Sequence, residues 1–388
     1  MTRRAILIVL DGLGSGAAHD AAAYGDSGSA TLGNVLRAHP ELRLPALESL
    51  GLGFCGDTGV ARPAKPRAAH GAAQPQSAGK DSTTGHWELC GLILETPFPT
   101  FPHGFPAELL AEFADETGRG VIGNKAASGT AILDELGAEH LATGSWIVYT
   151  SADSVFQVAA HEAVVPIGEL YEACQVARAL LIGSNGVSRV IARPFRGVQG
   201  AFQRTPRRKD FSREPTGPTL LDHLAAFEIP VSGVGKVDDL FAGRGISSIH
   251  AATNPEAYAL IEQRMADVQG GLVFANVIEF DQSWGHRNDV AGFVGGLKQL
   301  DQWIPQLLRQ ARDEDLIIFT ADHGNDPTTA STDHAREQVP VLCTGPRVRA
   351  VPIGERDTFA DVGQTIAEFL GVSPLVAGRS FLSEIWSA

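Results

Sequence analysis

The chain has 388 residues, 44% of them hydrophobic, which is enough to bury a large core and predicts two domains rather than one. Its formal net charge of −14 argues against nucleic-acid binding, because phosphate backbones are bound through basic surfaces. The four cysteines lie far apart with no Cys-x-x-Cys pair, which argues against a disulfide framework or a cysteine zinc site and favours a reducing compartment.

The first predicted element is a buried strand over residues 3–12, whose aliphatic run from Ala5 to Leu10 ends at Asp11. Continuous aliphatic residues are typical of strands covered on both faces, as in a parallel sheet flanked by helices. The run is too short for the core of a signal peptide, and no other apolar run is long enough to span a membrane. We therefore expect a cytoplasmic protein with no membrane partner.

Two later runs, residues 272–278 and 316–320, have the same character, and each is followed by an aspartate. In open α/β sheets, functional side chains gather beyond the carboxyl ends of the strands, so Asp11, Asp281 and Asp322 are expected to converge. Helical patterns alternate with these strands at residues 218–226, 255–268, 290–310 and 357–370. This alternation predicts an α/β core with a mostly parallel sheet flanked by helices.

A separate unit is predicted inside this core, over residues 98–213. It opens with the proline-rich stretch at 97–102 and closes with the basic, irregular stretch at 204–209. Between them lie its own predicted helices and strands, at residues 107–116, 132–140, 169–181, 145–150 and 188–192. Proline-rich edges and self-contained patterning predict an inserted α+β cap domain, with core segments at residues 1–97 and 214–388.

Four fragments supply candidate carboxylates and imidazoles: Asp11 alone, and the pairs Asp281-x-x-x-x-His286, Asp322-His323 and Asp333-His334. Hard divalent ions favour carboxylates, and imidazole extends the preference towards manganese, iron or zinc. A histidine considered alone is more often a residue making ordinary hydrogen bonds. Aspartates at three strand ends favour the metal interpretation here. The set predicts a two-metal site for phosphoryl transfer.

Hydroxyl side chains cluster at Ser82-Thr83-Thr84. The stretch before them, residues 67–79, is rich in Ala, Gly and Pro and is predicted to be an exposed loop. A hydroxyl bound to a metal ion can attack phosphorus and give a phosphoenzyme. A plain helix cap is the alternative, since Ser and Thr are favoured at helix starts.

The inserted segment offers candidate substrate contacts. If residues 151–155 are extended, alternation places Ser151, Asp153 and Val155 on one side. Arg189, Ile191 and Arg193 likewise share one face of a short predicted strand. The cations could bind a phosphate monoester while Asp153 accepts hydrogen bonds from sugar hydroxyls; further candidates are Arg204, Arg207 and Lys236. Solvation at the surface would explain most of these charges separately.

Several long strings of the sequence resemble the phosphopentomutase family. They are residues 79–88 (GKDSTTGHWE), 123–130 (GNKAASGT), 149–155 (YTSADSV), 191–195 (IARPF), 320–327 (TADHGNDP) and 332–334 (TDH). The resemblance runs over nearly the whole chain. It implies an alkaline-phosphatase-like α/β core with an inserted cap.

The resemblance also implies the residues of the site. Two Mn2+ ions per chain are implied, one held by Asp281, His286 and His334. The other is implied to be held by Asp11, Asp322 and His323, together with a nucleophile that matches Ser82. Residues implied to contact the distal phosphate and the sugar are Arg189, Arg204, Lys236, Ser151, Asp153, Val155 and Ile191.

The implied reaction moves phosphate between C1 and C5 of ribose or 2-deoxyribose, so the expected partner is a small sugar phosphate. The implied enzyme is phosphorylated on its nucleophile and primed by a sugar 1,6- or 1,5-bisphosphate. It donates that phosphoryl group to the substrate, which becomes a bisphosphate intermediate, and then takes back the other phosphate. Such an enzyme is an isomerase.

Three positions depart from the family pattern. Ser82 stands where threonine is usual, Glu279 where an aspartate is typical, and Asn288 where a second arginine commonly follows the metal histidine. Serine performs the same chemistry in related phosphomutases. These changes leave the implied metal ligands intact and bear instead on the substrate, so a modified pentose phosphate is an alternative.

Two other functions compete with the mutase. A metal-dependent phosphatase or phosphodiesterase could use the same core, but it would leave the phosphoenzyme open to water, whereas the large basic insertion favours a mutase. A sugar-phosphate-binding protein without activity is the third hypothesis, motivated by the changed nucleophile. Six metal-binding side chains argue against it, because a binding module gains nothing from them.

Overall fold

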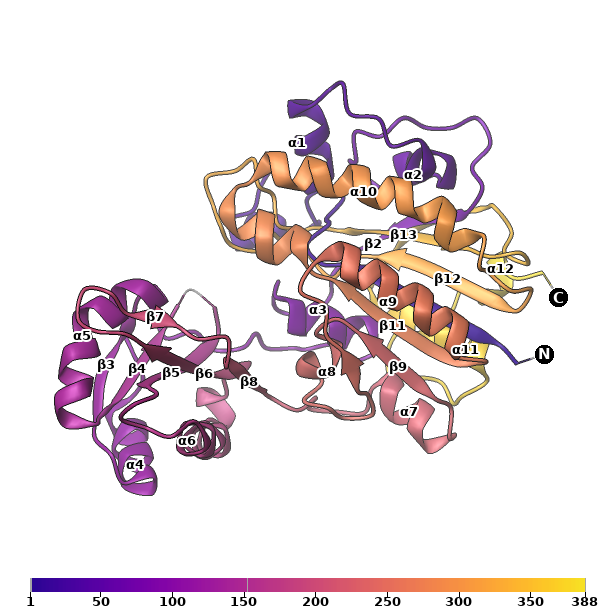
Figure 1. Ribbon diagram of the computed structural model, residues 1–388. Coiled ribbons are helices and arrows are strands. Elements are labelled where there is room, and N and C mark those ends of the chain that lie inside the picture. Colours follow the sequence, from indigo (N-terminus) through magenta and orange to yellow (C-terminus); the bar gives the residue numbers. More distant parts are fainter. Residues whose placement is uncertain (1, 152, 388) are drawn as a thin grey trace. The chain divides into compact units, whose positions relative to one another are not determined.

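The chain forms two compact units. The computed structural model describes residues 2–151 and 153–387. The core unit comprises the chain up to Pro97 and from Pro215 onward, and the inserted unit comprises Phe98–Glu214. Each unit has its own sheet and its own helices, coloured along the chain in Figure 1.

An eight-stranded sheet forms the centre of the core unit, in the order β10-β9-β11-β1-β12-β13-β2-β14. Strands β10, β9, β11, β1 and β12 are parallel to one another, and β13 is antiparallel to both of its neighbours. This arrangement confirms the predicted mostly parallel sheet. The strands are β1 (Arg4–Leu10), β2 (Ala69–Ala73), β9 (Val231–Val234), β10 (Ser248–Ile249), β11 (Gly271–Val277), β12 (Asp315–Thr320), β13 (Val339–Thr344) and β14 (Pro352–Arg356).

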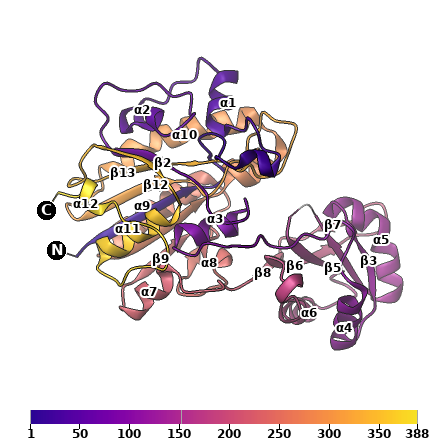
Figure 2. The same cartoon turned by 180° about the vertical axis from the view of Figure 1, so that it is seen from behind.

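Helices cover both faces of this sheet. Helices α9 and α10 lie over one face in Figure 1, and α11 lies over the opposite face, seen from behind in Figure 2. Strands β1, β11 and β12 are buried along their whole length as a result, which explains their continuous apolar sequences. The core helices are α1 (Thr31–Ala38), α2 (Pro45–Leu50), α3 (Ser82–Leu89), α7 (Leu220–Ala226), α8 (Val237–Leu240), α9 (Asn254–Asp267), α10 (Val290–Leu308), α11 (Ala360–Leu370) and α12 (Leu382–Ile385).

Side chains at the helix starts explain where several helices begin. Thr219 and Asp222 form a capping box at α7, and the Thr253 side chain accepts a hydrogen bond from a backbone N–H of α9. Short 3-10 turns and one π-helical turn complete the core unit: η1 (Ala21–Tyr24), η2 (Leu52–Phe54), the π-helix η4 (Phe280–Trp284) and η5 (Gly285–Arg287).

The predicted exposed loop at residues 67–79 is wrong over its middle. Strand β2 is fully buried there and pairs with β13 on one side and β14 on the other. Small residues are required at this position, because a Cβ added to Gly71 would lie 2.1 Å from the carbonyl oxygen of Gly354. Alanine and glycine are depleted in strands generally, so the composition gave no strand signal.

The inserted unit contains a mixed sheet in the order β3-β4-β5-β6-β7, with β8 pairing β6. Residues of β4 alternate between two apolar clusters, as strand geometry requires: Trp146 and Val148 join one, and Ile147 and Tyr149 the other. The elements are β3 (Val121–Ala126), β4 (Trp146–Thr150), β5 (Val155–His161), β6 (Arg189–Arg196), β7 (Gln203–Arg204), β8 (Lys209–Ser212), α4 (Ala107–Thr117), α5 (Gly129–Thr143), α6 (Ile167–Leu180) and η3 (Gly183–Asn185).

None of the helices among the described residues of either unit is long and apolar enough to cross a membrane.

One buried ion pair joins two central strands of the core unit. The Arg4 guanidinium on β1 donates from Nε and Nη2 to both carboxylate oxygens of Asp315 on β12, at 3.0 and 2.6 Å. Nη1 also donates to the carbonyl oxygens of Val268, at 2.9 Å, and Met265. Both charged side chains are only 1% exposed, so each depends on the other for its neutralisation.

We predict that Arg4→Met lowers the free energy of unfolding of the core unit by about 3–5 kcal/mol, because the substitution leaves the Asp315 carboxylate buried without its cation. Denaturation by urea measures the change. Arg37→Met is the matched control: Arg37 also pairs with an aspartate at 3.0 Å, but both side chains are more than half exposed. The control should cost no more than about 1 kcal/mol. Equal losses in the two variants would contradict this account.

Candidate active site

Three aspartates lie at one edge of the core sheet, beyond neighbouring strands. Strands β11, β1 and β12 end in register, with Leu10 opposite Val277 and Val9 opposite Thr320. Asp11 follows β1 directly, Asp322 follows β12 after one residue, and Asp281 lies in the π-helical turn η4 after β11. All three are at most 3% exposed. The predicted convergence of these carboxylates is present in the structure.

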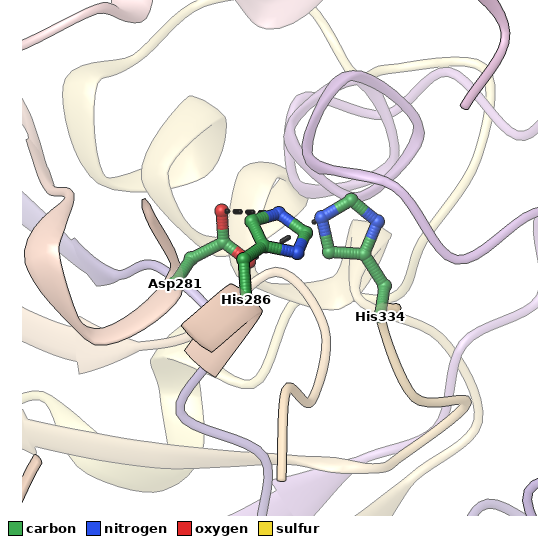
Figure 3. Close-up of side chains that lie close together, drawn as sticks. All are labelled: Asp281, His286 and His334. Atoms are coloured by element: carbon green, nitrogen blue, oxygen red, sulfur yellow. Dashed lines mark ion pairs between the residues drawn. The ribbon is translucent and has the colours of Figure 1, made fainter. Parts of the chain in front are cut away.

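Asp281 joins two histidines in a first group (Figure 3). Its two carboxylate oxygens lie 3.3 Å from His286 Nε2 and 3.3 Å from His334 Nε2. The His286 ring is oriented from its other side, where Nδ1 lies 2.7 Å from the carbonyl oxygen of Thr332. The three ligand atoms lie within 4.8 Å of one another, so one cation could contact all of them.

A second group lies beside the first and shares Asp281 with it. One ligand atom from each of Asp11, Asp281 and His323 falls within the same 4.8 Å limit. Asp322 reaches this group through His323, whose Nε2 lies 3.3 Å from Asp11 Oδ1 and 3.5 Å from Asp322 Oδ2. The ring of His334 connects the groups, with its centroid 4.2 Å from that of His323 and 4.7 Å from that of His286.

Ser82 is the first residue of helix α3, and its hydroxyl faces the second group. Oγ lies 3.3 Å from Asp11 Oδ1, to which it donates a hydrogen bond, and 3.1 Å from His323 Nε2. Thr84 is engaged otherwise, because its hydroxyl and its backbone N–H both donate to the capping carboxylate of Asp81. The helix approaches the Asp322 loop closely at Gly85, where an added Cβ would lie 2.2 Å from the Asp322 carbonyl oxygen.

Charge balance in the second group depends on one lysine. Burial raises the pKa of Asp11, but Lys236 Nζ lies 2.8 Å from Asp11 Oδ2 and its attraction holds that pKa well below the ordinary value. Burial likewise lowers the pKa of His323, yet Asp322 and Asp11 together raise it to about 10. Lys236 was predicted to contact a distal phosphate; the structure places its ammonium on Asp11.

The donor set fits divalent cations. Three buried carboxylates in one place require compensating positive charge, since buried charges are paired or bind metal ions. Asp322 Oδ2 accepts no hydrogen bond within the described part of the chain, which leaves an oxygen lone pair for an ion. His286 and His323 turn Nε2 to the carboxylates, and the Nδ1 of each lies against a backbone carbonyl, the arrangement usual for metal-bound imidazoles.

Asn325 and Glu337 support this geometry, and sequence reasoning missed both. Asn325 donates from Nδ2 to Asp281 Oδ1 at 2.7 Å, while its backbone N–H donates to Thr31 Oγ1 at 3.1 Å. The Thr31 hydroxyl donates in turn to Glu337 Oε1 at 2.7 Å. Asn325 lies in the string 320–327, which resembles the family, so its place beside Asp322 and His323 was a signal that could have identified it. Glu337 lies outside all of the strings that resemble the family.

Arg336 fixes the loop that precedes helix α3. Its guanidinium donates to the carbonyl oxygens of Ser77 and Gly79, at 2.6 and 2.5 Å, and pairs with Asp20 at 2.9 Å. This arginine follows His334 by two residues, so it connects the loop before Ser82 with the loop of a candidate metal ligand. It too was missed by sequence reasoning.

The candidate substrate residues of the inserted unit lie around strands β5 and β6. The condition that residues 151–155 form one strand is not met, because β4 ends at Thr150, β5 begins at Val155, and the Val155 N–H donates to the Asp153 carbonyl oxygen. Between the strands, Ser151 and Asp153 are half-buried, and Ala152 lies outside the described residues.

Two predicted phosphate contacts stand at opposite ends of β6. Arg189 begins the strand, opposite Val155 in the register, and lies 3.4 Å from Asp210 Oδ2. Arg204 pairs with Phe195 near the other end. Ile191 lies between them and is buried. The strand pairing therefore places Arg189 beside Val155 and Arg204 beside Phe195.

The two departures near the metal ligands have local structural roles. Glu279 accepts a hydrogen bond from the Asn254 N–H, at 2.6 Å, and so holds the start of α9. Asn288 has a left-handed backbone with φ of 52°, a conformation that asparagine adopts more readily than arginine does. Its side chain donates to the Ser331 carbonyl oxygen at 3.2 Å and also to Thr329. Neither residue belongs to the two candidate groups.

Comparison with known proteins gives one consistent result. The model of the metalloenzyme superfamily matches residues 3–374. A phosphopentomutase of Acetivibrio thermocellus is 50% identical over 386 residues, covering 99% of this chain and 100% of that protein. A phosphopentomutase of Dictyoglomus turgidum is 52% identical over 386 residues, covering 99% and 98%. Among solved structures, the PH0037 protein of Pyrococcus horikoshii shares the fold with a TM-score of 0.51 at 15% identity, covering 97% and 99%.

We predict that the buried Glu337 makes stability pH-dependent. Burial raises the pKa of its carboxyl from 4.5 to about 7, so the folded state retains a proton that the unfolded state loses. The contribution of this proton to the free energy of unfolding is fully present below pH 4.5 and is lost as the pH rises through about 7. Between these values the free energy of unfolding falls by up to about 1.4 kcal/mol per pH unit. Thermal unfolding at a series of pH values measures it.

Glu337→Gln should flatten this dependence, because the amide does not titrate. Glu95→Gln, at an exposed position of the core unit, controls for the loss of a carboxylate and should leave the pH dependence in place. A wild-type protein whose stability rises through the same window, relative to Glu337→Gln, would contradict the prediction.

Proposed function

The chain belongs to the phosphopentomutases, isomerases of the metalloenzyme superfamily with an alkaline-phosphatase-like α/β core, and we propose that it interconverts ribose or 2-deoxyribose 1-phosphate and 5-phosphate. The family membership confirms the prediction made from the sequence strings. The observation that carries the mechanism is the position of Ser82, with its hydroxyl between Asp11 and His323 at the start of a helix.

The divalent ions bound by this chain are proposed to be two Mn2+ ions. Asp281, His286 and His334 would hold one of them. Asp11, Asp322 and His323, with Ser82 beside them, would hold the other. Bound there, such ions would neutralise phosphoryl oxygens and favour the deprotonated form of a serine hydroxyl. The charge of the three buried carboxylates supports this assignment.

Ser82 is proposed to carry the phosphoryl group. The Asp11 carboxylate, held in its charged form, accepts the hydrogen bond of the serine hydroxyl and so orients Oγ towards the incoming phosphorus. A phosphoryl group on Oγ then sits at the amino-terminal end of α3, where the helix dipole favours negative charge. Arg336 and the Asp81 cap hold this end of the helix in place.

Turnover is proposed to pass through a bisphosphate. The free sugar hydroxyl attacks the phosphorus on Ser82; a new P–O bond forms to the sugar as the bond to Oγ breaks. The resulting pentose bisphosphate then returns its other phosphoryl group to Ser82, and the isomeric monophosphate leaves. A sugar 1,6- or 1,5-bisphosphate would supply the first phosphoryl group.

The inserted unit is proposed to be the cap domain that binds the sugar phosphate and excludes water. Its half-buried Ser151 and Asp153 offer acceptors for sugar hydroxyls, and Arg189 and Arg204 offer cations for the phosphate. Val155 and Ile191 complete the proposed set of this unit, and Lys236, whose ammonium pairs with Asp11, is proposed separately on the family resemblance alone. We further propose that the enzyme acts in the cytoplasm.

The proposed reaction predicts a specific phosphorus NMR result. Ribose 5-phosphate, incubated with enzyme, Mn2+ and a catalytic amount of glucose 1,6-bisphosphate, should give ribose 1-phosphate at a stable ratio without inorganic phosphate. Accumulating inorganic phosphate would instead indicate a hydrolase. Absence of any new signal with both ribose and 2-deoxyribose 5-phosphate would contradict the proposal and favour a modified pentose.

We predict that Ser82→Ala forms no phosphoenzyme and loses activity by several orders of magnitude, because the attacking oxygen is gone. Intact-protein mass spectrometry after incubation with glucose 1,6-bisphosphate measures the added phosphoryl group. Mn2+ binding should persist, since the carboxylates and imidazoles remain. Thr83→Ala is the control at the neighbouring hydroxyl and should be phosphorylated normally. Phosphorylation of Ser82→Ala would place the nucleophile elsewhere.

A further inference from the structure

A buried histidine and a buried asparagine lie beneath the second group without belonging to it. His86 is one helical turn after Ser82 on α3, and Asn276 is the penultimate residue of β11. Both are 0% exposed. The His86 ring stacks on Phe274, with centroids 5.8 Å apart and planes 22° from parallel, which fixes its orientation.

The hydrogen-bond partners determine which nitrogen of His86 carries the hydrogen and which way the Asn276 amide points. His86 Nδ1 lies 2.9 Å from the Ser82 carbonyl oxygen, which can only accept, so Nδ1 carries the hydrogen. His86 Nε2 lies 3.2 Å from Asn276 Nδ2, which can only donate, so Nε2 accepts. The other hydrogen of Asn276 Nδ2 goes to Asp11 Oδ2 at 3.1 Å.

The reverse orientation of the Asn276 amide is unfavourable. It would turn the amide oxygen towards the Asp11 carboxylate, oxygen against oxygen. With a neutral imidazole it would also place the hydrogen on His86 Nε2, so that Nδ1 and the Ser82 carbonyl oxygen would face each other as two acceptors. The orientation in the structure is the one that satisfies all three contacts.

The His86 ring also lies against a candidate metal carboxylate. Nδ1, whose hydrogen is directed to the Ser82 carbonyl oxygen, lies 3.0 Å from Asp322 Oδ2, an oxygen that accepts no hydrogen bond within the described residues. Asp322 Oδ1 is held from the opposite side by the Gly12 N–H at 3.1 Å. One imidazole therefore touches the nucleophile's own backbone carbonyl and one candidate metal carboxylate, and it reaches the other carboxylate through Asn276.

We propose that His86 and Asn276 are positioning residues that hold Asp11, Asp322 and the Ser82 end of α3 in one fixed arrangement. The proposal rests on the proposed function, in which those carboxylates bind a divalent ion beside the nucleophile. Hydrogen-bonded partners behind metal ligands orient the ligands, and removing such a partner weakens metal binding or activity by about 10–100-fold. A continuous network of this kind couples its members.

Two substitutions at His86 test the contacts of its two nitrogens separately. In His86→Asn, the amide NH2 can occupy the position of Nδ1, keep the donor to the Ser82 carbonyl oxygen and stay beside Asp322. In His86→Gln, the amide can reach Asn276 as Nε2 does, but the donor at Nδ1 is lost. Titration calorimetry of chelator-treated protein with Mn2+ alone measures the affinity, and mutase kinetics measure kcat and KM separately.

We expect His86→Gln to bind Mn2+ about 10–100-fold more weakly at one of two sites and to lower kcat with KM little changed. We expect His86→Asn to retain most of the wild-type affinity and turnover. Asn276→Leu, of similar volume and without donors, provides a second test if His86→Gln does not fold, and it should also weaken one Mn2+ site.

His140 in the inserted unit is the matched control. It is also 0% exposed, its Nδ1 lies 2.6 Å from the Ser145 carbonyl oxygen, and its Nε2 accepts from the His161 N–H at 2.8 Å. His140→Gln removes the same kind of contact away from the candidate metal ligands. It should lower stability without changing Mn2+ affinity.

Each outcome of these binding and kinetic measurements either supports or overturns the proposal. Unchanged Mn2+ affinity in His86→Gln and Asn276→Leu would overturn it, as would an equal loss in His140→Gln. A wild type that binds no Mn2+ would overturn both this inference and the proposed metal chemistry. A wild type that binds Mn2+ with the expected His86 effect but shows no mutase activity would support the inference and contradict the proposed function.

Discussion

The packing of three carboxylates at the ends of strands β11, β1 and β12 constrains the rest of the core unit. Buried carboxylates repel one another, so the surrounding chain supplies cations and donors from separate elements. Lys236 and the Asn276 amide both contact Asp11 Oδ2, while two imidazoles flank Asp281 and the Asn325 amide donates to Asp281 Oδ1. The sheet brings the charges together, and the loops beyond it determine what those charges can bind.

Much of this arrangement could be predicted, because its determinants are local in the sequence. Aliphatic runs that end in aspartate indicate buried parallel strands with acidic ends, and the structure contains them at Asp11 and Asp322. Strand β2 was missed because its alanines and glycines serve a close backbone approach that only its neighbours reveal. His86 and Asn276 were missed for a related reason: each makes its decisive contacts with residues far away in the chain.

The inserted unit shows where pattern reasoning fails. Alternation assigns faces correctly within a strand, as the two apolar clusters around β4 demonstrate, but it requires the strand to continue. Strand β4 ends at Thr150 and β5 begins at Val155, so Ser151 and Val155 belong to different strand ends. Arg189 and Arg204 were grouped by charge and by family resemblance, and strand pairing places their backbones at opposite ends of β6.

Asp281 makes the two candidate groups interdependent. Its carboxylate lies within reach of both, and the π-helical turn η4 that carries it is held by Asn325, which comes from the loop bearing Asp322 and His323. A shift of that loop would therefore move a ligand of each group at once. Ser82 is linked to the same loop through His323 and through the close contact at Gly85. The Ser82 hydroxyl and both candidate groups are therefore connected through one loop, so that their relative positions depend on it.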